Sequence, residues 1–305
     1  MINMNIKPIF LALTIVASFA QAAPVGIASG QPTGTNYPMA ADISKICSTA
    51  ASPINNVESE GSLDNIGKIY TDKKVQYGII QVDAVEYMKG QDPKMMEKIV
   101  MVFPFFSTEI HLIAKSDSSI TSLSQLAGKN VVEGPEGSGT WVTVQVIKQL
   151  TGIKWNAIKA SQIDGFDQVM SGKADAEFIV AGAPITLLTK KTGFKLIPIS
   201  SAKIDDFGLY TKALVPSGTY PSIKTSLSTY KVDNVLATFA FKNQYSLEIT
   251  ELVSCLASNI DKLQTAEGFH PKWRDVNPLD IDRIKMTSHP AAVAAIKRLN
   301  LVQRK

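Results

Sequence analysis

The hydrophobic pattern alternates between short apolar runs and longer amphipathic segments along most of the chain. Amphipathic segments predict helices and short apolar runs predict strands. The strands are expected at 25–28, 55–58, 75–80, 130–133, 176–180 and 195–198, and the helices at 39–49, 63–70, from about 83, 122–127, 141–150, 166–171 and 184–189. This alternation is typical of a parallel sheet covered by helices.

One long extended stretch divides this pattern into two similar units. Residues 99–115 are rich in Val, Phe and Ile, and a further strand at 230–241 leads into C-terminal helices. We therefore expect an α/β protein of two lobes with a central ligand cleft, because such sheets bind ligands outside the carboxyl ends of their strands. Lobe I is expected to comprise 23–108 and 225–305, and lobe II 109–224.

The N-terminus has the order of a secretory signal peptide. Lys7 precedes an uncharged apolar run at 8–19, and the small residues Ala20 and Ala22 follow. That run is shorter than the ~20 residues that span a bilayer. We expect a signal peptide at 1–22, cleaved near Ala22/Ala23, and a periplasmic protein; an uncleaved anchor is the alternative.

Charge and cysteine content exclude several classes of partner. The net charge of +4 is small and scattered, which gives no reason to expect nucleic acid. Cys47 and Cys255 are the two cysteines, and either a disulfide or a pair of buried thiols is open. The three histidines are separated from one another and from the cysteines, so we expect no metal site and no cofactor.

The strongest candidate site is the loop 134–140, with the sequence GPEGSGT between a predicted strand and helix. Glycines permit close backbone approach, and the free N–H groups of a helix start attract anions. Ser138, Gly139 and Thr140 are the expected contacts. Thr140 stands where a P-loop has lysine, which argues against nucleotide hydrolysis. A glycine-rich helix start without a ligand is the alternative.

Three further loops follow strands of the first unit, and one follows a strand of the second. Thr35 and Asn36 offer hydrogen bonds and Tyr37 an aromatic wall. Ser62 is placed as an N-cap, and Asp83 with Glu86 has capping-box spacing, which favours a cap over ligand contact. Gln81 has no such structural duty. Gly182 brings backbone N–H groups from the second lobe, and a plain turn is the alternative for the loops of Tyr37 and Gly182.

Two observations limit the chemistry of the cleft. Arginine does not occur before Arg274, so an acidic ligand must be held by backbone N–H groups, hydroxyls, amides or a lysine. Glu109 and His111 alternate on one face of the extended stretch, but no nucleophile neighbours them. We therefore expect structural roles for both residues and no enzyme activity.

With these loops in view, the sequence resembles the TAXI family, the TRAP-associated extracytoplasmic immunogenic solute-binding proteins. The resemblance covers nearly the whole mature chain, in seven blocks in the family's order: GTNYP, EGSLDNI, QVDA, STEIHLIAKSDSSITSLSQLAGKNV, GPEGSGT, GKADAEFIVAGAP and VPSGTYP. Asn36 replaces a second aromatic residue that the family usually has, and Val82 replaces a serine.

The resemblance implies a type II periplasmic-binding-protein fold and a function. It implies ligand contacts at Thr35, Tyr37, Ser62, Gln81, Ser138, Gly139, Thr140 and Gly182. The expected function is capture of a small carboxylate, either an amino acid such as glutamate or a 2-oxo or dicarboxylic acid, by a monomer that delivers it to a TRAP-type ion-coupled transporter. If the ligand is an amino acid, Glu136 or Asp83 is expected to accept its ammonium group. A receptor for an ATP-driven importer or for a membrane sensor is the alternative.

Overall fold

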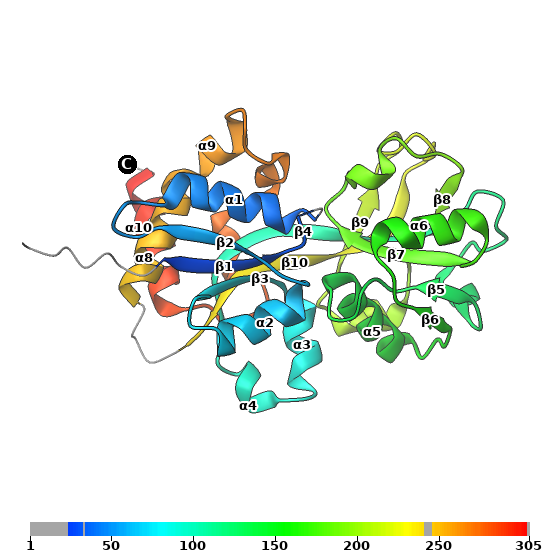
Figure 1. Cartoon of the computed structure of the whole chain (residues 1–305), viewed down its shortest axis with the longest axis horizontal. Coiled ribbons are helices and arrows are strands. Elements are labelled where there is room, and N and C mark those ends of the chain that lie inside the picture. The colour runs from blue at the N-terminus through cyan, green and yellow to red at the C-terminus, as the bar shows by residue number, and fades with distance from the viewer. Residues whose placement is uncertain (1–23, 33, 241–245, 304–305) are drawn as a thin grey trace, which may run out of the picture.

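The computed structural model describes residues 24–32, 34–240 and 246–303, which form two lobes side by side (Figure 1). The predicted signal peptide lies outside the described residues. The strands are β1 (Val25–Gly30), β2 (Ile54–Glu58), β3 (Tyr77–Gln81), β4 (Ile99–Lys115), β5 (Asn130–Val132), β6 (Asn156–Ile158), β7 (Ala176–Ala181), β8 (Phe194–Leu196), β9 (Thr211–Val215) and β10 (Leu227–Phe239).

Helices cover the sheet in both lobes. The α-helices are α1 (Asn36–Cys47), α2 (Ser62–Thr71), α3 (Val82–Lys89), α4 (Pro93–Met96), α5 (Gly139–Thr151), α6 (Gln162–Ser171), α7 (Ala202–Phe207), α8 (Ser246–Ser258), α9 (Ile260–Thr265) and α10 (Pro290–Gln303). Short 3₁₀ helices are η1 (Leu123–Leu126), η2 (Thr186–Leu188), η3 (Pro271–Asp275) and η4 (Pro278–Asp282). No helix among the described residues is long and apolar enough to cross a membrane.

The sheet is mixed, which corrects the expectation of a parallel sheet. Its order is β2-β1-β3-β10-β4-β7-β5-β6, with β8 beside β4 and β9 beside β10. The outer strands of each lobe pair in parallel, but β10 is antiparallel to β3 and β4, and β4 is antiparallel to β7. The chain crosses to lobe II along β4 and returns along β10, so these long strands run in opposite directions.

The partners of the crossing strand β4 change along its length. It pairs with β10 from Ile99 to Glu109, and with β7 from Glu109 to Ala114. Apolar side chains on both faces explain its length, because nearly all of its residues are buried. The expected lobe boundary at 108/109 falls at this change of partner, and the exact boundaries stay a prediction.

Two predicted helices take a different form. Residues 122–127 and 184–189 contain the 3₁₀ helices η1 and η2 in place of α-helices. Ser122 makes no side-chain capping bond at the start of η1, and the Gln125 side chain accepts a hydrogen bond from the Thr121 N–H, at 2.6 Å. Segments of three or four residues between loops are too short for an α-helical hydrogen-bond ladder, and 3₁₀ turns suit them.

A disulfide joins the end of α1 to α8 and settles the open question about the cysteines. Cys47 and Cys255 are bonded, with a Cα–Cα distance of 5.9 Å. The bond ties the beginning of lobe I to its C-terminal segment across a sequence separation of 208 residues. Stable disulfides form in oxidising compartments, which agrees with the predicted export of the chain.

Candidate ligand-binding cleft

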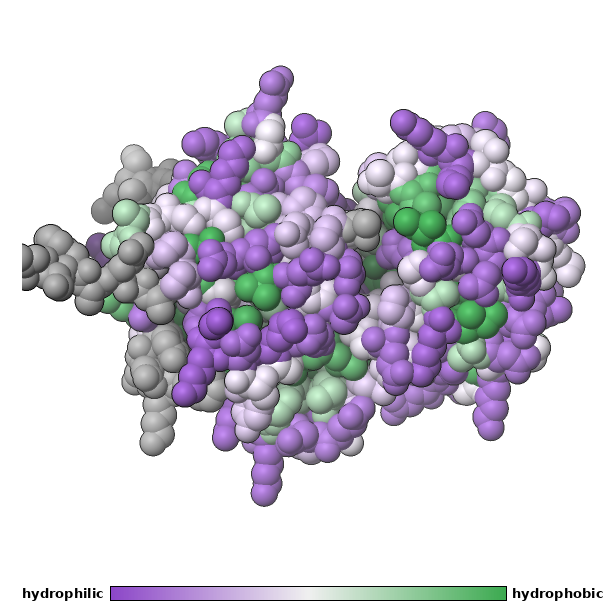
Figure 2. All heavy atoms as spheres, viewed as in Figure 1, coloured by the Kyte–Doolittle hydropathy of each residue, from purple (hydrophilic) through white to green (hydrophobic). Residues whose placement is uncertain are grey.

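The carboxyl ends of strands from both lobes meet between the lobes, where Figure 2 shows the surface hollowed. β3 ends at Gln81 and β7 at Ala181, and the two strands reach the crossing strands from opposite lobes. The loops after β2 and β5 also meet: a Cβ added to Gly61 would lie 3.1 Å from Ser138 Cα. The loops of Ser62 and Ser138, both selected from the sequence, therefore face one another across the junction of the lobes.

The start of α5 is built as a tight turn that ends in an N-cap. Gly134 and Gly137 have φ of 82° and 81°, which favours glycine. Ser138 is the N-cap, and its Oγ accepts a hydrogen bond from the Trp141 N–H at 3.2 Å. Thr140 Oγ1 accepts from the Val180 N–H at 3.0 Å, which fixes the helix start against the end of β7. Both hydroxyls therefore have structural partners.

Gln81 reaches from lobe I to this helix start. Its Nε2 donates to Thr143 Oγ1 at 3.4 Å, and its Oε1 lies only 1.6 Å from where a Cβ on Gly139 would stand. Glycine at 139 is therefore what allows the amide to approach. Ser62 is not the N-cap of α2, a place taken by Gly61; its Oγ instead accepts from the Gln81 N–H at 3.2 Å.

Asp83 bridges the two lobes, and the capping role predicted for it is wrong. α3 begins at Val82 with Gln81 as the N-cap, which puts Asp83 inside the helix. Asp83 Oδ2 accepts hydrogen bonds from Thr143 Oγ1 at 2.6 Å and Tyr210 OH at 3.0 Å, while Oδ1 has no partner among the described residues. Burial raises the pKa of this carboxyl group to about 6.

The start of α1 leaves polar atoms without protein partners. Thr35 is the N-cap but its side chain makes no capping bond, and the Tyr37 backbone oxygen accepts from Asn56 at 2.9 Å. Asn36 Oδ1 is buried without a partner among the described residues, as is Ser59 Oγ at the end of β2. Buried polar atoms without partners are costly, so these two atoms are candidates for contact with a ligand. Sequence reasoning had not selected Ser59.

Glu136 lies at the surface and does not share this environment. Its side chain is 62% exposed and pairs with Lys159 at 2.5 Å. It belongs to the loop before α5 but is engaged outside the buried cluster around Gln81 and Asp83. The structure therefore brings Gln81, Asp83 and the α5 start together and leaves Glu136 apart.

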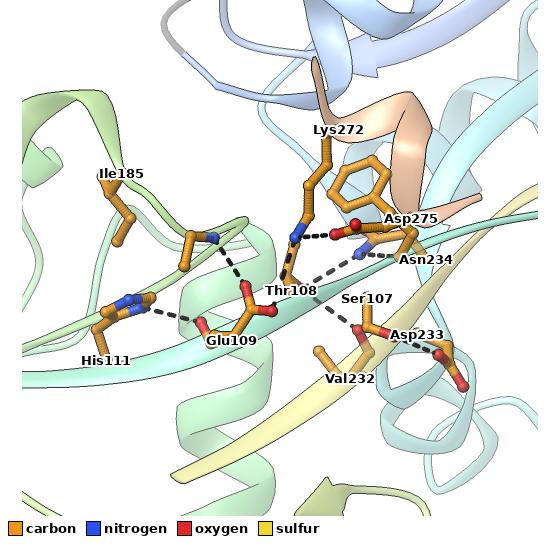
Figure 3. Close-up of polar contacts among 12 residues, drawn as sticks. Ser107, Thr108, Glu109, His111, Ile185, Val232, Asp233, Asn234, Lys272 and Asp275 are labelled. Carbon is orange, nitrogen blue, oxygen red and sulfur yellow. Dashed lines mark hydrogen bonds and ion pairs between the residues drawn. The ribbon is translucent and has the colours of Figure 1, made fainter. Parts of the chain in front are cut away.

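Gly182 contacts a lysine that the sequence analysis did not select. A Cβ added to Gly182 would lie 2.9 Å from Lys272 Cε. Lys272 comes from η3 of lobe I, and its Nζ lies 3.6 Å from Glu109 Oε1 and 2.6 Å from Asp275 Oδ2 (Figure 3). Glu109 Oε2 accepts from the Ala183 N–H at 2.7 Å. The absence of arginine before Arg274 had left a lysine as one of several groups that could hold an acidic ligand, and no sequence pattern indicated Lys272.

His111 is buried and holds the loop after β7. Its Nε2 lies 2.9 Å from Tyr220 OH, whose oxygen accepts from the Ile185 N–H at 2.9 Å. Its Nδ1 lies 3.1 Å from the backbone oxygen of Glu109, so Nδ1 carries the proton and Nε2 accepts from Tyr220. Burial lowers the pKa of His111 to about 4. The imidazole touches the Glu109 carbonyl and not its carboxylate, so the two side chains form no acid–base dyad.

Comparison with known proteins agrees with this architecture. The periplasmic sulfonate-binding protein SsuA described from Methylobacillus flagellatus KT is 14% identical, with a TM-score of 0.57 over 92% of this chain and 96% of that chain. A structure described as a periplasmic transporter is 12% identical, with a TM-score of 0.53 over 93% and 98% of the two chains. At these identities the likeness shows the fold, which is the two-lobed fold of periplasmic binding proteins.

A family model identifies the chain more directly than these distant structures. The NMT1-like family model matches residues 27–297. The match begins in β1, ends in α10 and includes every loop of the cleft. The chain therefore belongs to the NMT1-like family.

Proposed function

We propose that this protein is an exported solute receptor that closes its two lobes on a small carboxylate and delivers it to a membrane transporter. The observation that carries the proposal is the contact between lobes at the loops of the strand ends. Gly61 lies against Ser138, Gln81 against Gly139, and Asp83 binds Thr143 and Tyr210. Closure of this kind is driven by a ligand that binds the closed form more tightly.

The polar groups of the cleft suit binding and not turnover. Asp83 and His111 are buried with hydrogen-bond partners, and the hydroxyls of Ser138 and Thr140 accept structural bonds. A hydroxyl nucleophile needs a base within hydrogen-bond reach, and neither Ser138 nor Thr140 has one among the described residues. We therefore assign these groups to positioning and ligand contact.

The TAXI resemblance supports a TRAP-type transporter as the partner. The seven sequence blocks include the loops that face the cleft, and the resemblance extends to the GAP loop at 182–184. A receptor for an ATP-driven importer is the second candidate, since SsuA is described as part of a sulfonate ABC transporter. A TRAP membrane component encoded beside this chain supports the first partner, and an ATPase subunit supports the second.

The binding function is tested with the mature protein and a panel of organic acids and amino acids. A ligand present at 1,000 times its Kd stabilises the folded state by about 4 kcal/mol, which is a clear rise in the melting temperature. Mass spectrometry of solute released from natively purified protein identifies the ligand independently. The proposal fails if no member of the panel raises the melting temperature and no solute is released.

A further inference from the structure

Lys272 is unusual because a lysine rarely lies inside a protein. Its side chain is 9% exposed, and it is the one buried lysine or arginine among the described residues. Charged side chains are seldom buried unless they are paired. The position also joins the lobes, since Lys272 belongs to the C-terminal segment of lobe I and its stem covers Gly182 of lobe II.

The carboxylate partners of Lys272 do not use all the hydrogen-bond donors of its ammonium group. Asp275 Oδ2 lies 2.6 Å from Nζ, but Glu109 Oε1 is 3.6 Å away, which is too long for a hydrogen bond. An ammonium group has three donors. Glu109 uses its other oxygen for the Ala183 N–H, so Nζ and Oε1 face each other as a loose ion pair (Figure 3).

Space and further polar groups lie beside this pair. A pocket of about 170 Å³ has Glu109 and Asp275 in its wall, together with Ser107, Lys231 and Arg283. That volume equals about five or six water molecules at about 30 Å³ each, which suits a small solute.

We propose that Lys272 and Glu109 bind the two charged groups of a small zwitterionic ligand. Lys272 binds the ligand's carboxylate, and Glu109 Oε1 accepts its ammonium group. This inference rests on the proposed function and narrows the ligand to α-amino acids and similar zwitterions. It also assigns the ammonium to Glu109, which lies beside Lys272, whereas Glu136 is paired at the surface.

The charge balance of the cluster favours a zwitterion over a dicarboxylate. Lys272 and the charged residues of the pocket wall (Glu109, Lys231, Asp275, Asp280 and Arg283) together carry no net charge, so a net-neutral zwitterion keeps the site balanced and a dianion does not. A zwitterion that separates Nζ from Oε1 gives each of them a new partner of opposite charge. No buried charge is then left unpaired, which is the condition for a favourable buried ion pair.

The first experiment measures ligand affinity by isothermal titration calorimetry with the mature protein. The probes are the twenty L-amino acids and, for each binder, the matched acid without its amino group, such as glutarate for glutamate. We expect at least one amino acid to bind and its deaminated analogue to bind at least about 30-fold more weakly. Equal affinity for the deaminated acid overturns the inference and leaves the proposed function intact.

The second experiment separates the two side chains. Lys272→Met keeps the stem over Gly182 and should weaken amino-acid binding at least about 30-fold, while Lys272→Arg should restore most of it. Glu109→Gln keeps an acceptor for Ala183; it should weaken binding of the amino acid but change the affinity for the deaminated acid less than about threefold. Lys159→Met is the control for loss of a surface lysine.

Folding of each variant is checked by circular dichroism and by its melting temperature. If Lys272→Met does not fold, the Glu109→Gln comparison decides alone, since the inference requires its effect to depend on the ligand's amino group. Unchanged amino-acid affinity in folded Lys272→Met overturns the inference. Failure of the wild-type protein to bind any acid or amino acid overturns the proposed function itself.

Discussion

At the scale of single residues, Asp83 combines a charge that burial disfavours with contacts to both lobes. Thr143 and Tyr210 of lobe II donate to one of its oxygens, and the other oxygen has no partner among the described residues. Desolvation opposes ionisation of this carboxyl group more than the hydrogen bonds from Thr143, Tyr210 and the backbone favour it. Because Asp83 belongs to lobe I and its carboxyl group binds two residues of lobe II, the protonation state of this group affects the contact between the lobes.

This raised pKa predicts a pH dependence of stability. The pKa of Asp83 is about 6 in the folded protein against an ordinary value of 3.8, so the folded state binds the proton more tightly than the unfolded chain does. The free energy of unfolding should fall as pH rises from about 4 to about 6, by about 3 kcal/mol. In Asp83→Asn this contribution should be absent.

Urea denaturation at pH 4.5 and 7.5 measures the difference between wild type and Asp83→Asn. Burial also raises the pKa of Glu177, to about 9, and lowers that of His111, to about 4. Those groups are present in both proteins, so their contributions cancel in the comparison. Parallel pH profiles for the two proteins would show that Asp83 is not shifted.

A second prediction at this scale concerns Tyr220, which positions the loop after β7. Tyr220→Phe removes the hydroxyl that serves both His111 and the Ile185 N–H. Two buried polar groups then lack a partner, so we expect a loss of about 1–3 kcal/mol in the free energy of unfolding. Tyr70→Phe, on a ring that is 53% exposed, is the control. Equal unfolding free energies for the two variants would contradict the assigned network.

At the scale of elements, the disulfide connects parts of lobe I that are far apart in sequence. Cys47 ends α1, and Cys255 lies in α8 beyond the whole of lobe II. The double variant Cys47→Ala/Cys255→Ala should lose about 2–5 kcal/mol of stability. Guanidinium denaturation under non-reducing conditions measures it, and a reducing agent should destabilise the wild type but not the variant. Unchanged stability of the variant would contradict a structural role.

The sequence predicted elements well where burial imposes a strong pattern. The fully buried β4 reads as one extended stretch, and the helices of lobe I appear as amphipathic segments. β6 and β9 were not predicted, because most of their residues are exposed and give no apolar alternation. The predicted helix starts differ from the observed ones by up to four residues. As a result, Ser62 was predicted as the N-cap where Gly61 holds that position, and Asp83 was predicted at a cap.

The sequence predicted only those parts of the candidate site that are formed by residues close together in the chain. Loops after strands can be located from periodicity, so Gln81 and the start of α5 were selected. Lys272 lies about 90 residues from Gly182 in sequence, and only the packing of η3 against the crossing strands brings them together. Likewise, the partners of Asp83 come from α5 and from the segment before β9, and no spacing in the sequence indicates that contact.

At the scale of the whole molecule, the contact between lobes depends on the absence of side chains at two glycines. Gly61 has a φ of 122°, and an added Cβ would lie 3.1 Å from Ser138 Cα in the other lobe. Backbone atoms cannot yield as a flexible side chain can. Gly139 faces the end of the Gln81 side chain, which can move aside, so Gly61 is the stricter test of closure.

Gly61→Ala should therefore impair closure while leaving each lobe folded. We expect the variant, with ligand present, to keep a larger radius of gyration than the wild type by small-angle X-ray scattering, and to bind that ligand at least about tenfold more weakly. Gly128→Ala is the matched control, because Gly128 also has a positive φ, 72°, but a Cβ there meets no atom within 4 Å. If Gly61→Ala closes and binds like Gly128→Ala, the contact at Ser138 does not limit closure.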